Sequence, residues 1–154
     1  MKKFLKISSV LIILAGVFLV IGGIWGISFT YKNVAREKIV TPKDATIPET
    51  PVRGPLTLKA QADIIREHTL EITGGKTFAE MPRQIQKLDQ NNQPVLDSSG
   101  NPVMTANTAR DIWITATMLT TALNFGILAY AFSGLIILFG IICIWIGIVF
   151  YAQD

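Results

Sequence analysis

The sequence lacks charge in two long stretches. Charged residues make up 16% of its 154 residues, whereas about 25% is usual in soluble domains. None lies between Lys6 and Lys32, and none lies between Asp111 and Asp154. An ordinary soluble enzyme of this size would not have such gaps, and a disordered chain would not be 50% hydrophobic. The two gaps predict two membrane segments.

Reactive side chains are also scarce. The chain has one cysteine, Cys143, and one histidine, His68. A single cysteine excludes an intramolecular disulfide and a cysteine-rich metal site. A lone histidine on a partly apolar helix is usually structural or solvated, so His68 is a weak candidate for a metal ligand. There is no glycine-rich phosphate loop, nucleophile elbow or pair of catalytic carboxylates, so we expect a protein that is not an enzyme and has no cofactor.

The first uncharged run, residues 7–31, is long enough for a transmembrane helix, which needs about 20 apolar residues. It exceeds the roughly 7–15 apolar residues of a signal peptide, although cleavage before Phe29 stays open as the alternative. The second run, residues 112–153, would extend roughly 60 Å as one helix, about twice the hydrocarbon thickness. We expect a threonine-faced, membrane-proximal helix over 107–124 that leads into a transmembrane helix over 125–151.

Basic residues near the ends of the spans predict the orientation. Lys2, Lys3 and Lys6 precede the first span, and the tail 152–154 has no basic residue. Lys32, Arg36 and Lys38 follow the first span and oppose this assignment. However, the segment that they begin is longer than the roughly 60 residues within which loop charges count well. We therefore expect a bacterial plasma-membrane protein whose tails, 1–6 and 152–154, are cytoplasmic and whose segment 32–124 lies outside.

Each span carries small residues at intervals of seven, which favours close packing of two membrane helices along a left-handed crossing. The predicted packing residues are Ser9, Gly16, Gly23 and Thr30 in the first span and Gly126, Ser133, Gly140 and Gly147 in the second. An antiparallel hairpin would set Ser9 against Gly147, Gly16 against Gly140, Gly23 against Ser133 and Thr30 against Gly126. The fold class expected is a mainly α membrane protein built on this two-helix hairpin.

A second small-residue pair, Gly22 and Gly26, forms a GxxxG motif in the first span. Motifs of this kind allow two transmembrane helices to approach closely. We expect this face to be available to a partner, either another membrane protein or a second copy of the chain. The lipid bilayer is the other expected partner, and nucleic acid is not expected.

The segment outside the spans predicts a small helical cap. Prolines over 41–56 indicate an extended connector. A helix over about 57–73 follows, with Thr57 as N-cap and Gly74-Gly75 as the stop. Its apolar face, covered by extensions of both spans, would give a cap of three helices. A short β-hairpin is expected over 93–105, and Asn107 or Thr108 would cap the next helix.

A family resemblance follows from residues 60–80, AQADIIREHTLEITGGKTFAE. This segment, together with the two-span layout, resembles small membrane proteins common in actinobacteria, many of which are labelled aromatic ring-opening dioxygenases. The resemblance implies the two-span layout and no activity that can be transferred. A facial-triad iron oxygenase needs two histidines and one carboxylate, and this chain has one histidine.

Three functions compete on the sequence. The leading one is a non-catalytic accessory or scaffold subunit that presents an extracytoplasmic domain to a partner. The alternative is a sensory or binding module for a small apolar molecule, with a surface near Ile65, His68 and Met118. The third, a metal-dependent enzyme built on His68, has the least support.

Overall fold

The computed structural model describes residues 2–152, so the ends of the two predicted tails, Met1 and Gln153–Asp154, lie outside the described residues. The fold is mainly α. Its elements, in chain order, are α1 (Lys2–Arg36), α2 (Pro55–Ile72), the 3-10 helix η1 (Phe78–Glu80), β1 (Gln84–Gln86), β2 (Met104–Ala106) and α3 (Thr108–Ala152). The chain forms two compact units, which are described in turn. One contains the residues up to Gln61 and those from Leu123 on, and the other contains Ala62–Ala122.

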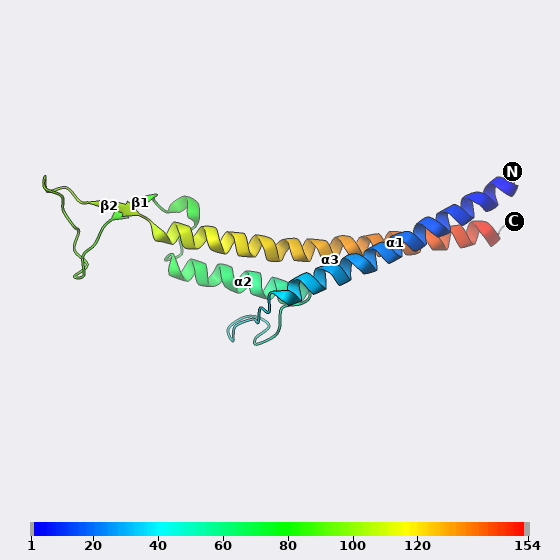
Figure 1. The fold of residues 1–154 in the computed structure, drawn as a ribbon, viewed down its shortest axis with the longest axis horizontal. Coiled ribbons are helices and arrows are strands. Elements are labelled where there is room, and N and C mark those ends of the chain that lie inside the picture. The colour runs from blue at the N-terminus through cyan, green and yellow to red at the C-terminus, as the bar shows by residue number, and fades with distance from the viewer. Residues whose placement is uncertain (1, 153–154) are drawn as a thin grey trace. The chain divides into compact units, whose positions relative to one another are not determined.

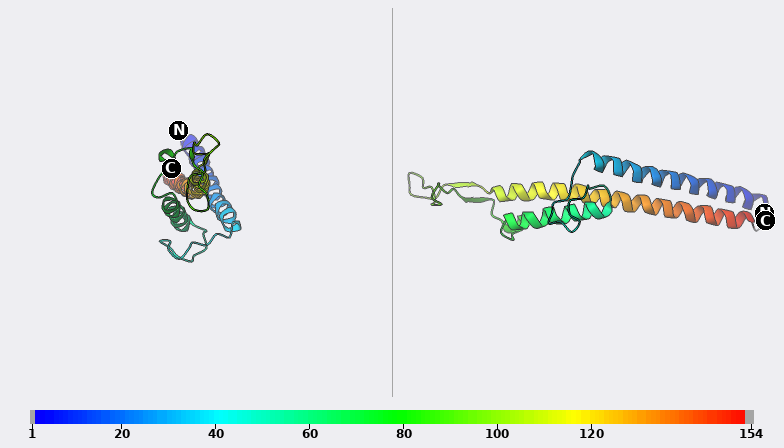
Figure 2. Two further views of the ribbon diagram at one scale, coloured as in Figure 1. Left: turned by 90° about the vertical axis from the view of Figure 1, so that its left-hand side faces the viewer. Right: turned by 90° about the horizontal axis from the view of Figure 1, so that it is seen from below.

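In the first unit, α1 runs antiparallel to the C-terminal part of α3, and two views agree that they lie side by side (Figures 1 and 2). Both helices are long and apolar enough to cross a membrane. α3 is one continuous 45-residue helix, with no break at the boundary expected between residues 124 and 125. The membrane-proximal and transmembrane helices of the sequence analysis are therefore two parts of one element.

Small residues line the contact between α1 and α3. A Cβ atom placed on Gly16 would lie 2.6 Å from the carbonyl oxygen of Gly140, and one on Gly23 would lie 2.8 Å from that of Ser133. A Cβ atom on Gly147 would lie 2.9 Å from the carbonyl oxygen of Ser9. Real Cβ atoms do not approach this closely, so the two backbones touch only because these side chains are absent.

The contacts occur in one register, and α2 reaches the fourth expected position. The structure places Gly16 against Gly140, Gly23 against Ser133 and Gly147 against Ser9. At the fourth position, however, the three atoms nearest to a Cβ on Gly126 all belong to Leu58, the closest at 3.1 Å. A fully buried side chain of α2 thus lies beside Gly126, and the pairing of Thr30 with Gly126 stays a prediction.

The GxxxG pair does not form one free face. A Cβ on Gly22 would meet nothing within 4 Å, whereas one on Gly26 would lie 2.5 Å from the hydroxyl oxygen of Ser133. Gly26 therefore belongs to the intramolecular contact. The expectation that both glycines are available to a partner is wrong for Gly26, since α3 crosses α1 closely enough to reach it.

The hydroxyl residues of α1 do not need a partner on α3. Ser9 Oγ donates to the carbonyl oxygen of Leu5 at 2.7 Å, and Thr30 Oγ1 donates to that of Gly26 at 2.9 Å. Both side chains are buried, and both hydrogen bonds return to the helix that carries them. Ser9 and Thr30 therefore act as small residues whose polar atoms are already satisfied.

The connector after α1 folds back on itself and is not extended as predicted. α1 ends at Arg36, where Lys38 adopts a positive φ of 53°. Val40 then pairs with Pro51, and the amide of Thr41 donates to the carbonyl oxygen of Thr50 at 3.0 Å. The prolines stop helix formation, and the buried side chains of Thr41 and Val52 close the loop.

Arg53 joins this connector to both long helices. Its guanidinium donates to the hydroxyl oxygen of Tyr31 at 3.2 Å, and its carbonyl oxygen accepts from the hydroxyl of Tyr130 at 2.6 Å. Arg53 also begins the turn into α2, because its amide donates to Thr57 Oγ1 at 3.0 Å. Thr57 was expected as the N-cap of α2. It lies inside the first turn instead, and its hydroxyl oxygen accepts the hydrogen bond from Arg53, which precedes the helix.

In the second unit, α2 ends where the sequence predicts. Gly74 and Gly75 both take positive φ, 63° and 77°, and the amide of Gly75 donates to the carbonyl oxygen of Leu70 at 2.7 Å. Asn107 is the cap of α3, since its Oδ1 accepts from the amide of Ala109 at 3.1 Å. Among the described residues this unit contains parts of two long helices, α2 and α3. α1 stops at Arg36 and belongs to the first unit, so the expected cap of three helices stays a prediction.

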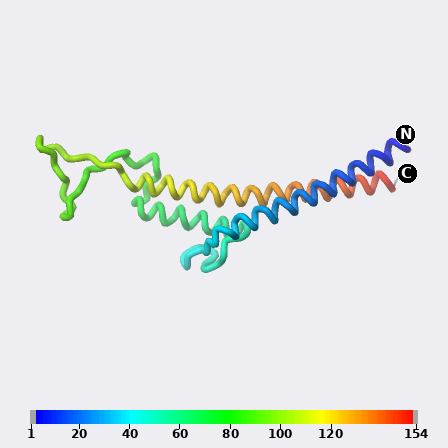
Figure 3. The backbone as a smooth tube through the Cα atoms, in the orientation of Figure 1, coloured from blue at the N-terminus to red at the C-terminus, as the bar shows by residue number. Residues whose placement is uncertain are grey.

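The expected hairpin over 93–105 is present only in part. β2 pairs antiparallel with β1, with Ile85 opposite Thr105, and not with residues near 94–97. Between the two strands the chain divides into two arms, which Figure 3 shows at the end of the tube. The predicted turn at Ser98–Gly100 closes one of these arms, where Leu96 pairs with Pro102.

We predict that Gly16→Val weakens the packing of α1 on α3 and that Gly22→Val does not. The new side chain at residue 16 would meet the backbone of Gly140, whereas the one at residue 22 would meet nothing within 4 Å. Overpacking of this kind costs about 1–3 kcal/mol. Unfolding followed by tryptophan fluorescence in mixed detergent micelles measures the difference. Equal loss of stability in both variants would contradict the observed contact.

Candidate functional site

The most exposed part of the second unit is encoded by a tandem repeat that the sequence analysis missed. Residues 88–95 read LDQNNQPV and residues 96–103 read LDSSGNPV, so Leu, Asp, Pro and Val recur at intervals of eight. Each copy forms one arm. We call the region from β1 to β2, residues 84–106, the tip. An alignment of the sequence with itself at a spacing of eight would have revealed this repeat.

Both arms use the same turn. In the first, Asp89 Oδ1 accepts from the amides of Asn91 and Gln93 at 2.8 and 2.9 Å. In the second, Asp97 Oδ1 accepts from the amides of Ser99 and Asn101 at 2.8 and 2.9 Å. The fourth turn residue has a positive φ in each, 59° at Asn92 and 81° at Gly100. An aspartate that accepts two backbone amides is a common way to fix a tight turn.

A closed cycle of backbone hydrogen bonds joins the arms to the strands. The amide of Lys87 donates to the carbonyl oxygen of Val103, that of Val103 to Val95, and that of Val95 to Lys87, each at 2.8 Å. The three residues are eight positions apart in sequence. Each one donates once and accepts once, so the three segments meet at one junction. The paired strands β1 and β2 form its third arm.

The residue after each member of this cycle is apolar and about half exposed. Leu88, Leu96 and Met104 have exposed fractions of 51%, 57% and 49%. We refer to these three exposed side chains, each of which follows a member of the cycle, as the apolar triad. Val95 and Val103, on the alternate positions, are less exposed. The turns that follow Leu88 and Leu96 are polar, and large apolar side chains exposed beside polar residues can mark an interaction surface.

The electrostatics of the second arm favour an ionised aspartate. Backbone hydrogen bonds from Asn101 and then Ser99 lower the pKa of the exposed Asp97 carboxyl below its ordinary value of 3.8. The turn is therefore held by a carboxylate over the whole neutral range.

At the base of the tip, Arg110 contributes a second polar anchor. Its Nη1 donates to the carbonyl oxygens of Phe78 and Met81, and its guanidinium lies 3.7 Å from the centre of the Phe78 ring.

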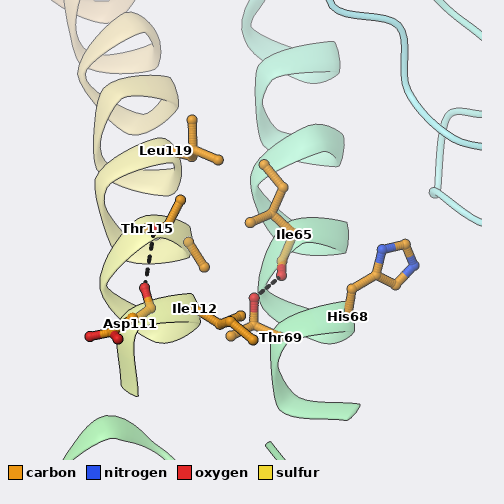
Figure 4. A pocket seen from close by; sticks show the side chains of 8 residues that line it. Ile65, His68, Thr69, Asp111, Ile112, Thr115 and Leu119 are labelled. Atoms are coloured by element: carbon orange, nitrogen blue, oxygen red, sulfur yellow. Dashed lines mark hydrogen bonds between the residues drawn. The ribbon is translucent and has the colours of Figure 1, made fainter. Parts of the chain in front are cut away.

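The second unit also has two grooves beside the N-terminal part of α3. The larger, about 430 Å³, is lined by Ile65, His68 and Thr69 of α2 and by Asp111, Ile112, Thr115, Ala116 and Leu119 of α3. In Figure 4 the His68 ring points away from α3. The threonine hydroxyls donate within their own helices, Thr69 to Ile65 at 2.6 Å and Thr115 to Asp111 at 3.0 Å. The groove therefore offers mainly apolar surface.

The smaller groove, about 370 Å³, lies beside Met118. It is lined by Phe78, Trp113, Ile114, Thr117 and Met118. Arg66 of α2 lies over the Trp113 ring, 5.7 Å from its centre. The structure thus brings Ile65 and His68 together in one groove and places Met118 in another, whereas the sequence analysis grouped all three.

The described residues contain no cluster that would bind a metal strongly. Among residues 2–152, no three side chains of histidine, cysteine, aspartate or glutamate gather closely enough to hold a metal ion. His68 has an interaction within the chain, and its ring points away from α3 (Figure 4). Asp89 and Asp97 already accept amide hydrogen bonds in their turns.

Comparisons with protein-family models, curated proteins and solved structures find no match to this chain.

We predict that the second arm loosens only in strong acid. Because the folded pKa of Asp97 is lowered, its stabilising effect is present above the ordinary value of 3.8 and is lost as the pH falls through the lower folded value. In NMR spectra recorded in micelles, the amide signals of Ser99 and Asn101 should shift together with a midpoint below 3.8. Asp97→Asn should abolish the transition. A midpoint above 3.8 would contradict the role given to these hydrogen bonds.

Proposed function

We propose that this protein is a non-catalytic, two-span membrane scaffold that presents its tip to a partner protein outside the membrane. In this account α1 and the C-terminal part of α3 form the membrane hairpin, and residues 32–124 lie outside the plasma membrane. The observation that carries the proposal is the apolar triad, which stands exposed on a tip fixed by its own backbone hydrogen bonds. The resemblance to small two-span actinobacterial proteins supports the same layout.

The distribution of side chains in the first unit supports a membrane location. The small residues Ser9, Gly16, Gly23, Gly140 and Gly147 are buried, while the large apolar side chains point outward. The exposed set includes Phe4, Phe18, Trp25, Phe125, Phe132, Phe139 and Trp145. Water would disfavour so large an apolar surface, whereas lipid solvates it.

The charges of the chain support the proposed orientation. Lys2, Lys3 and Lys6 precede the first span, and α3 ends without a basic residue in its last turn. Basic residues beside a span favour the cytoplasmic side. Both ends of the hairpin would then be cytoplasmic, and the tip would lie outside.

The construction of the tip supports presentation to a partner. A two-stranded hairpin without a core is marginal in water, and both β1 and β2 are exposed. The repeated aspartate turns and the cycle through Lys87, Val95 and Val103 hold the tip in place of a core. The triad is therefore available on a fixed support. Contact with a partner protein would remove its apolar surface from water and stabilise the complex.

The direct test compares two double variants of the full-length protein in its native membrane. Leu88→Asp/Leu96→Asp places charge in the triad. Gln90→Asp/Ser98→Asp places the same charge at equivalent positions of the two exposed turns and serves as the matched control. After chemical cross-linking and purification, the proteins joined to the wild-type chain should be lost from the first variant and kept by the second.

Two results would contradict this function. One is an identical set of captured proteins for both variants, which would mean that the triad makes no contact. The other is a wild-type chain that captures no protein. Circular dichroism of both variants checks that the helices remain folded.

The larger groove favours a second candidate function, the binding of a small apolar molecule. Its volume of about 430 Å³ lies within the roughly 300–1,000 Å³ of ordinary ligand sites. Ile65, Ala116 and Leu119 supply apolar surface. The hydroxyls of Thr69 and Thr115 are already hydrogen-bonded within their own helices, so they would not hinder an apolar ligand. The groove is widely open and would enclose a ligand poorly. The binding of a small molecule is therefore less well supported than the scaffold function.

We predict that Ala116→Phe fills this groove and removes any bound apolar molecule. Ala116 lines the groove, whereas Ala122 is exposed on the same helix and does not line it, so Ala122→Phe is the control. Native mass spectrometry of protein released from nanodiscs should show a bound small molecule with the wild type and the control only. Equal occupancy in all three proteins, or none in the wild type, would exclude this function.

A further inference from the structure

The part of the first unit that joins α1 to α2 carries an excess of positive charge. Residues 32–61 include six basic and three acidic residues. Lys43 Nζ lies 3.9 Å from Oε1 of Glu49 and forms an ion pair with it. Arg53 is exposed and pairs with no carboxylate in the described part of the chain. Its guanidinium donates instead to the hydroxyl oxygen of Tyr31, so this cation is held at the C-terminal end of α1.

The backbone on both sides of Arg53 is fixed. Val52 is buried, and its amide donates to the carbonyl oxygen of Ile39 at 2.9 Å. The amide of Arg53 donates to Thr57 Oγ1, and its carbonyl oxygen accepts from the hydroxyl of Tyr130. The guanidinium therefore extends from a defined place, and less conformational entropy is lost when it binds an anion.

Two tyrosines indicate the depth at which Arg53 would lie in a membrane. Tyr31 ends the uncharged run of α1 that begins at Ile7. Tyr130 begins a part of α3 that continues to Tyr151 and extends roughly 32 Å, at about 1.5 Å per residue. The hydrocarbon core is about 30 Å thick, and tyrosines are enriched at both of its boundaries. Because Arg53 contacts both Tyr31 and Tyr130, its guanidinium would lie beside the lipid phosphates.

We propose that Arg53 is the centre of a binding site for the phosphate group of an anionic phospholipid. A guanidinium presents five N–H donors in one plane and can bind two oxygens of the same phosphate. Tyr31 accepts from Nη1 only, so the other nitrogens can still donate to a phosphate. The exposed Leu56, in the first turn of α2, offers apolar surface close to Arg53 in sequence, as a lipid ligand requires.

Further basic residues lie at the same end of α1. Lys32 and Arg36 are four positions apart on this helix and so share a face, and Lys38 follows in the connector. All three are exposed, and each basic residue near a membrane surface adds attraction to anionic lipids. An acidic partner protein would have to reach headgroup depth to meet the Arg53 guanidinium, whereas lipid phosphate is already there.

The experiment is NMR of the full-length protein in nanodiscs, with ¹⁵N in its arginine side chains. The chain has five arginines, and the Nε–H signal of Arg53 is the one missing from the spectrum of Arg53→Gln. The nanodiscs contain phosphatidylcholine, part of which is replaced stepwise by phosphatidylglycerol. The Arg53 signal should shift and reach saturation. The signal of Arg66, which lies over Trp113 in the second unit, should stay in place.

Retained lipid gives a second reading with a matched control. Arg53→Gln and Lys43→Gln each remove one positive charge from an exposed residue of the connector. Native mass spectrometry of protein released from the mixed nanodiscs counts the lipids that stay bound. Arg53→Gln should retain several-fold less phosphatidylglycerol than the wild type, and Lys43→Gln should retain as much as the wild type.

Three results would overturn the proposal. One is an Arg53 signal that does not respond to phosphatidylglycerol. The second is an equal loss of retained phosphatidylglycerol in Arg53→Gln and Lys43→Gln, which would mean that only the overall charge matters. The third is an equal shift of the Arg53 signal when inorganic phosphate is added to nanodiscs of phosphatidylcholine alone, which would indicate an ion site and not a lipid site.

This inference needs α1 and α3 to span the bilayer, as the proposed function states, but it depends neither on the orientation of the hairpin nor on the partner of the tip. An unresponsive Arg53 in a protein whose triad still captures a partner would reject the lipid site and leave the scaffold standing. A responsive Arg53 in a protein that captures no partner would support the lipid site and reject the scaffold.

Discussion

The close approach of two helix backbones at small residues is the contact on which the rest of the structure depends. Gly16 and Gly140 let α1 and α3 touch, and Ser9, Gly23, Ser133 and Gly147 repeat that contact at intervals of seven. In lipid there is little hydrophobic attraction between helices, so close packing must supply much of their association. It also turns the large apolar residues outward, which is the arrangement expected of helices that lipid solvates.

The tip achieves order by different means. It has almost no buried side chain, yet a repeated sequence gives both arms the same aspartate turn, and backbone hydrogen bonds join Lys87, Val95 and Val103 in a cycle. Such a structure does not use its apolar residues for a core. Leu88, Leu96 and Met104 are consequently left at the surface, where they can contribute to binding. This is why the proposed function assigns the tip, and not the grooves, the main role.

Much of the helical structure could be predicted because its signals are local or periodic. The uncharged runs indicated both long helices, and Gly74-Gly75 marked the end of α2. Features that depend on distant partners were missed. The connector folds back because Val40 pairs with Pro51. Gly26 is covered by Ser133 of α3, and Gly126 is covered by Leu58 of α2. The repeat in the tip was visible in the sequence, but its cyclic junction depends on three segments meeting at once.

The register of α1 against α3 is most directly measured by disulfide formation between paired cysteines in the Cys143→Ala protein. A Cβ on Gly16 would lie 2.7 Å from Cγ1 of Ile144. Gly16→Cys/Ile144→Cys should therefore form a disulfide once the two backbones have moved apart enough to admit the new Cβ at residue 16. A slip by one heptad would instead pair residue 16 with Ile137, which the structure places beside Gly23. Formation of the 16–144 disulfide without the 16–137 disulfide is the predicted result. Preferential formation of the 16–137 disulfide would contradict the account.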